Sequence, residues 1–151
     1  MFARMKTEKH PYADRPEDDV YALHEICRKI GERAGNLFRT RQLWCSGAAL
    51  VALNHALDGS LSEELAIRLT SGLSDGMGGS GCLCGALNGG ALALGIFLGS
   101  GRLAPNGDQR VLQATRELHN SFKAAFGSTC CRTLLHCFSE CKEFHLIIVH
   151  N

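Results

Sequence analysis

The feature that most constrains the fold is a glycine-rich stretch covering residues 71–101. Up to Gly81, its glycines predict a turn that needs positive φ angles or brings backbone segments close together. From there Gly85, Gly89 and Ala93 follow at four-residue intervals, which puts small residues on one face of a helix. We therefore expect a glycine-rich turn leading into a central small-residue helix that packs closely against another backbone.

Two other readings of this stretch are less consistent with the sequence. Residues 82–101 are uncharged and about long enough to span a membrane, but Asn88 is polar and the glycines dilute the hydrophobicity, so we expect no membrane span. The stretch also contains a literal GxGxxG, from Gly76 to Gly81. This pattern follows a predicted helix instead of a strand, which argues against a dinucleotide site.

The composition indicates one helical domain that is rich in cysteine. A chain of 151 residues can bury a core without metals or disulfides, and a net charge of +1 gives no basic surface for nucleic acid. Eight cysteines without an N-terminal secretion signal favour a cytoplasmic protein whose thiols bind metal or do redox work. We expect a mobile tail over residues 1–16 and a single domain over residues 17–151, with small molecules and proteins as partners.

Hydrophobic periodicity and capping residues predict an all-α fold, a compact bundle of about six helices. Thr40 is the predicted cap of the second helix, Ser60 opens a capping box for the third, and Gly127 ends the fifth. The predicted helices cover residues 20–38, 41–57, 61–73, 82–101, 108–126 and 130–149.

The cysteines form no local metal-binding motif, so a shared site would need thiols from distant helices. Cys27 fits the apolar stripe of the first helix and is expected to be a buried structural thiol. The alternative that the cysteines serve only as small apolar residues in a tightly packed bundle stays open.

Several cysteines lie near predicted helix starts, where backbone amides lower the pKa of a thiol. Cys45 is in the first turns of the second helix, and Cys130 and Cys131 are both in the first turn of the last helix. Cys82 and Cys84, if both are helical, would face nearly opposite ways. Only one thiol of each close pair is then expected to join a shared site.

Residues 45–141 resemble the redox-active proteins of the C-GCAxxG-C-C family. The matching segments, in order, are WCSGAAL, LSEELAIRLTSGL, GMGGSGCLCGALNGGALALG, FKAAFGSTCCRTLL and ECKEF. The resemblance implies a helical protein in which Cys45, Cys84, Cys131 and Cys141 converge on a redox or metal centre.

The chain departs from the family pattern at several cysteines. The interval between Cys131 and Cys141 is short, so Cys137 competes with Cys141 for the last position. Cys82 and Cys130 are additional thiols beside two family positions, where they could enlarge a ligand set or resolve a disulfide.

Three functions follow as hypotheses. The first is an electron-transfer protein whose four family cysteines bind an iron–sulfur cluster, with Gly76, Gly78 and Gly85 beside the cofactor and zinc as another possible metal. The second is cofactor-free thiol–disulfide chemistry in which Cys131 or Cys84 attacks and a neighbour resolves. The third is a non-catalytic interaction module, in which the glycine strip forms a homodimer. In the first two, the expected partner is another redox protein.

Overall fold

The computed structural model describes residues 17–102 and 108–140, with side chains described over residues 18–102 and 108–136. In these ranges the chain forms six right-handed helices, which confirms the all-α prediction. They are α1 (Glu17–Arg39), α2 (Cys45–Ala56), α3 (Glu63–Thr70), α5 (Gly85–Leu98), α6 (Gln109–Phe126) and α7 (Cys131–Glu140). The 3-10 turn η1 (Ser71–Leu73) and the short element α4 (Ser74–Met77) connect α3 toward α5. The predicted tail over residues 1–16 lies outside the described residues.

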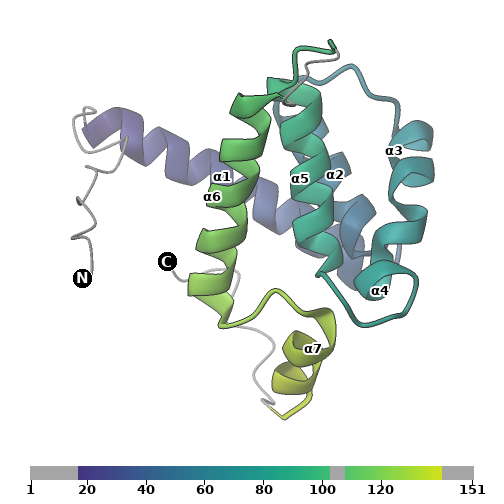
Figure 1. The fold of residues 1–151 in the computed structure, drawn as a ribbon. Helices are drawn as coiled ribbons and strands as arrows, with labels where there is room; N and C mark the ends of the chain where they lie inside the picture. Colours follow the sequence, from purple (N-terminus) through teal and green to yellow (C-terminus); the bar gives the residue numbers. More distant parts are fainter. Residues whose placement is uncertain (1–16, 103–107, 141–151) are drawn as a thin grey trace, which may run out of the picture.

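Helices α2 and α5 form the centre of the bundle, and α1, α3 and α6 surround them (Figure 1). Leu50 and Val51 of α2 make a buried core with Ala66 of α3 and Ala93 of α5. Half-buried side chains from α1, α2, α5 and the connecting segments pack around this core: Leu37, Leu43, Leu53, Leu61, Leu92 and Phe97. Helix α2 thus contacts α1, α3 and α5, and its seven buried residues are more than any other helix of the described chain carries.

The glycine strip of α5 packs against α2, as the four-residue spacing predicts. A Cβ on Gly89 would overlap the carbonyl oxygen of Ser46 and lie 3.0 Å from the Cβ of Ala49. The next residue, Gly90, faces the side chain of Leu118 on α6. Because α2 of the same chain occupies the strip, the strip is not a free surface for a second copy.

The helix boundaries were predicted correctly for some elements and wrongly for others. Helix α6 ends as expected at Gly127, which is left-handed with φ 74°. Helix α3 is capped by Ser62, whose hydroxyl accepts from the backbone N–H of Leu65, so the predicted Ser60 cap is wrong. Thr40 is not the cap of α2, because its hydroxyl donates to the carbonyl oxygen of Asn36 and so completes the end of α1.

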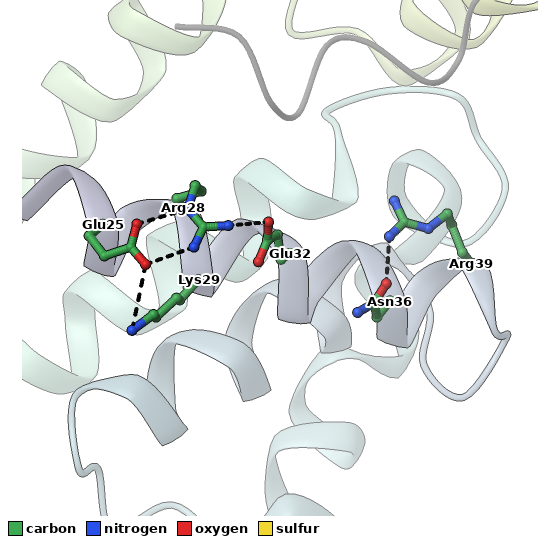
Figure 2. A network of polar contacts seen from close by, with 6 residues as sticks. All are labelled: Glu25, Arg28, Lys29, Glu32, Asn36 and Arg39. Carbon is green, nitrogen blue, oxygen red and sulfur yellow. Dashed lines mark hydrogen bonds and ion pairs between the residues drawn. The ribbon is translucent and has the colours of Figure 1, made fainter.

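Charged side chains form a row of ion pairs and hydrogen bonds along the exposed surface of α1 (Figure 2). The guanidinium group of Arg28 lies between the carboxylates of Glu25 and Glu32, and Lys29 reaches Glu25 from the next position. These pairs are exposed, so they contribute little to stability. No helix in the described ranges combines the length and apolar character that a membrane crossing requires.

Candidate functional site

Three helices of the bundle begin at or directly after a cysteine. Cys45 is the first residue of α2, Cys84 is the N-cap of α5, and Cys131 is the first residue of α7. The first backbone N–H groups of a helix have no partner inside the helix, and this end carries the positive pole of the helix dipole. Each of these thiols therefore lies at a helix end that favours negative charge.

An extended backbone pairing joins the starts of α5 and α7. Leu83 and Cys130 form an isolated antiparallel bridge. Beside it, the N–H of Cys84 donates to the carbonyl of Thr129 at 2.8 Å, and the N–H of Arg132 donates to the carbonyl of Gly81 at 3.1 Å. Cys82 and Cys84 thus precede α5, so the helix predicted from residue 82 starts later, and the condition under which the two thiols would face opposite ways is not met.

Gly85 allows the starts of α2 and α5 to meet. The Sγ of Cys45 lies so close to this glycine that a Cβ on residue 85 would overlap it. The same Cβ would also lie 3.3 Å from the carbonyl oxygen of Leu73 and 3.4 Å from the backbone nitrogen of Ser46. Three segments therefore approach one another at Gly85, and the half-buried Cys45 lies beside them.

The glycine-rich turn contains a run of left-handed backbone. Residues 75–79 have φ values between 54° and 82°, and within this run Asp75 and Met77 are not glycine. The N–H of Gly78 donates to the carbonyl of Ser74 at 3.0 Å, which closes one left-handed helical turn. A left-handed conformation costs about 1–2 kcal/mol for each non-glycine residue. Such strain persists only where the surroundings enforce it.

The left-handed turn contacts Cys131 directly. A Cβ on Gly76 would lie 2.7 Å from the Cβ of Cys131 and 2.6 Å from the backbone nitrogen of Cys82. The Sγ of Cys131 is 3.9 Å from the Oδ1 atom of Asp75. Asp75 was not predicted as a site residue: the Asp-Gly pair indicates left-handed backbone but not which helix it touches.

Cys131 is buried, with 7% of its surface exposed, among groups that carry or can carry negative charge. Burial raises the pKa of its thiol to about 11, with further contributions from Cys84, Asp75 and Cys45 in that order. The prediction that the helix start lowers this pKa is wrong for Cys131, because desolvation and like charges outweigh the dipole. Cys45, Cys84 and Cys131 are therefore close enough for a charge on either of the first two to affect the ionisation of the third.

Cys130 shows the opposite behaviour, although it is next in sequence. Hydrogen bonds from the backbone N–H and the side chain of Thr133 lower the pKa of its thiol, and Arg132 adds to this effect. Its Sγ also lies 3.1 Å from the carbonyl oxygen of Gly81. The first-turn prediction therefore holds for Cys130, and the sequence did not indicate which of the two neighbours would follow it.

The remaining predicted residues do not contact the three thiols or lie outside the described side chains. Gly78 is left-handed, but only the carbonyl oxygen of Gly72 lies near its Cβ position, so it shapes the turn without contacting a thiol. Cys27 is exposed, and the prediction of a buried thiol is wrong because none of the described side chains of α1 is buried. Cys141 lies outside the described residues, as does the side chain of Cys137.

The described side chains contain no group of three or more His, Cys, Asp or Glu residues arranged to hold a metal ion. The described cysteines are all free thiols. These are Cys27, Cys45, Cys82, Cys84, Cys130 and Cys131. The donor chemistry suits a soft metal, whereas the arrangement of the described donors does not form a metal site.

Fold and site together define an all-α, cysteine-rich protein whose thiols gather at helix N-termini. The family model "Putative redox-active protein (C_GCAxxG_C_C)" matches residues 43–146, and the chain belongs to this family. No curated protein and no solved structure matches the chain. The family resemblance inferred from the sequence is thereby confirmed.

Proposed function

We propose that the chain is a redox protein that works through thiol–disulfide chemistry, with Cys84 and Cys131 as the reacting pair and Cys45 beside them. The observation that supports this most directly is the convergence of three helix N-termini that carry these thiols. Among the cysteines, Cys84 has the strongest electrostatic effect on Cys131. The bridge between Leu83 and Cys130 holds the two backbones side by side.

The proposed reaction oxidises the pair with a disulfide of a partner protein. Cys84 loses its proton and attacks one sulfur of the partner disulfide, which gives a mixed disulfide and releases one partner thiolate. Cys131 then loses its proton and attacks the Cys84 sulfur, which forms the Cys84–Cys131 disulfide and releases the second partner thiolate. Because burial keeps Cys131 protonated at neutral pH, the first attack is assigned to Cys84.

An iron–sulfur cluster bound by Cys45, Cys84, Cys131 and Cys141 is the second candidate, and it would make the chain an electron-transfer protein. Four thiolates are the usual ligands of such clusters, and helix N-termini favour their negative charge. The groups that disfavour ionisation of Cys131 would be neutralised by a bound cation. When bound, the cluster would supply one-electron transfer. Because the described donors form no metal site, no step is assigned to it.

The other assignments follow from either candidate. Gly76 and Gly85 would leave space beside Cys131 and Cys45, and Gly78 would shape the turn that carries them. The expected partner is a redox protein of the cytoplasm. A homodimer would have to use a surface other than the glycine strip, because α2 packs there.

Anaerobic purification of the full chain, followed by absorption spectra and iron, sulfide and zinc analysis, separates the candidates. A metal-free sample with a reversible two-electron thiol titration is expected for the dithiol pair, and stoichiometric iron and sulfide would favour the cluster. Cys84→Ser and Cys131→Ser should each abolish the titration. Cys27→Ser removes an exposed thiol of α1 and serves as the control. If both site variants behave like this control, the site assignment fails and a non-catalytic interaction module becomes the better hypothesis.

A further inference from the structure

Two buried serine hydroxyls and a backbone carbonyl form a hydrogen-bonded chain next to the thiol site. The hydroxyl of Ser46 donates to the carbonyl oxygen of Thr70 at 2.9 Å, and its Oγ lies 2.6 Å from the Oγ of Ser74. All three residues are buried. A buried polar group lowers the stability of the fold unless it is hydrogen-bonded. The hydroxyls must therefore keep the geometry in which their hydrogen bonds form.

The number of available protons fixes the direction of these hydrogen bonds. A serine hydroxyl carries a single proton, and that of Ser46 is used on the carbonyl of Thr70. Ser74 must therefore donate to Ser46. The two bonds join the first turn of α2 to the end of α3 and to the start of the left-handed turn.

Each serine is next in sequence to a residue of the thiol site. Ser46 follows Cys45, and Ser74 precedes Asp75, whose carboxylate is 3.9 Å from the Sγ of Cys131. The left-handed conformation that begins at Asp75 is unfavourable by itself, so contacts from outside the turn must hold it. The hydrogen bond between Ser46 and Ser74 is a buried contact of this kind, and it anchors the turn to α2.

We propose that Ser46 and Ser74 are positioning residues of the thiol site. Their hydrogen bond fixes the left-handed turn on α2 and thereby sets the distance between the thiols of Cys45 and Cys131. The reason why this distance matters rests on the proposed function. The distance itself can be measured in a chain that has no redox activity.

The test measures cross-linking of Cys45 to Cys131 by dibromobimane, a reagent that becomes fluorescent when both of its arms have reacted with thiols. The full-length chain is reduced, kept with a chelator, and the cross-linked peptide is quantified by mass spectrometry. Ser46→Ala and Ser74→Ala should each lower the Cys45–Cys131 yield by about tenfold, because small displacements strongly slow reactions that need two aligned groups. The matched control is Ser71→Ala, which removes an exposed hydroxyl that donates to the carbonyl of Arg68 and should leave the yield unchanged.

Urea unfolding of the same variants separates positioning from stability. Ser46→Ala removes one hydrogen bond to the Thr70 carbonyl and leaves the Ser74 hydroxyl without its partner. The double variant also removes that hydroxyl, so it should be at least as stable as Ser46→Ala. The cross-link yield of the double variant should nevertheless stay low. Three outcomes would each overturn the positioning role. In the first, the cross-link yield of the double variant recovers together with its stability. In the others, the single variants keep the wild-type yield, or the wild-type chain gives no Cys45–Cys131 product. A lowered yield in a chain without redox activity would retain the positioning role and remove only the proposed function.

Discussion

The contact between α2 and α5 and the contact between α5 and α6 bring helices together by different means. At the first, backbones meet directly, since a Cβ on Gly89 would overlap the carbonyl oxygen of Ser46. At the second, side chains mediate the contact: Leu118 approaches Gly90, and no residue of α6 is buried. The first contact leaves no room for an added atom, whereas exposed side chains at the second can adjust.

The thiol of Cys45 lies at the less adjustable of these two contacts, whereas Cys131 lies against the left-handed turn. The Sγ of Cys45 lies directly beside Gly85, and the Cβ of Cys131 lies directly beside Gly76 of the left-handed turn. Rigid surroundings keep reacting groups in a fixed relation, which a redox pair requires. The difference between tight and adjustable surroundings can be tested by adding single atoms where the backbone is crowded and where it is open.

The largest effect is expected for Gly76→Ala. The new Cβ would meet backbone atoms of Cys82 and Gly81 as well as Cys131, and residue 76 has a φ of 68°. We expect a loss of about 3 kcal/mol or more in the free energy of unfolding, from overpacking and backbone strain together. Gly78→Ala is the matched control, because its φ is 61° but its Cβ position is open, so about 1 kcal/mol should be lost. Equal losses in urea unfolding would show that the contact with Cys131 contributes nothing.

The second largest effect is expected for a substitution at the start of α5. Gly85→Ala should destabilise the chain by about 2 kcal/mol, because its Cβ would displace the Sγ of Cys45 or shift α2. Gly95→Ala changes the same helix where nothing lies within 4 Å, so it should stabilise the chain by about 0.5–1 kcal/mol. Thermal unfolding of both variants measures the difference. A stabilising Gly85→Ala would mean that α2 and α5 do not meet as described.

Much of the fold could be predicted because apolar and small residues recur in the sequence at the period of a helix. The apolar stripes of α1 and α6 identify both helices to within a few residues, and the four-residue glycine spacing identifies the α2-facing side of α5. These patterns depend on each helix alone. A helix that must bury one face shows that face in its sequence.

The details of the site could not be predicted because they depend on which segments meet in space. Nothing in the sequence distinguishes Cys130 from Cys131, because hydrogen bonds from Thr133 lower the pKa of the first, whereas burial and neighbouring charges raise the pKa of the second. The contact of Asp75 with Cys131 and the hydrogen bond of Ser74 to Ser46 also join residues far apart in the chain. Family resemblance supplied the cysteine set, but not the groups that surround it.

A smaller effect is expected from relieving strain in the turn. Met77 is exposed and has a φ of 68°, so Met77→Gly should raise the free energy of unfolding by about 0.5 kcal/mol after the entropy of the added glycine is counted. Asp58→Gly is the matched control, with a φ of 50° at the other end of α2. Both should stabilise, but only Met77→Gly should change the Cys45–Cys131 cross-link yield. A change in yield from both variants would mean that the turn is not specifically coupled to the thiols.

The smallest effect is expected at the exposed charges of α1, where side chains can rearrange freely. The Arg28 side chain, followed by the charge of Lys29, lowers the pKa of the Glu25 carboxyl from 4.5 to about 2. Because the folded value lies below the unfolded one, the contribution of Glu25 to stability is present above pH 4.5 and is lost as the pH falls toward 2. Urea unfolding of the wild-type chain and of Glu25→Gln between about pH 6 and pH 2 should show a small difference that disappears toward the acid end. If the difference in the free energy of unfolding stays constant over this range, the pair with Arg28 does not form in solution. If the difference is large, surface contacts also constrain this fold.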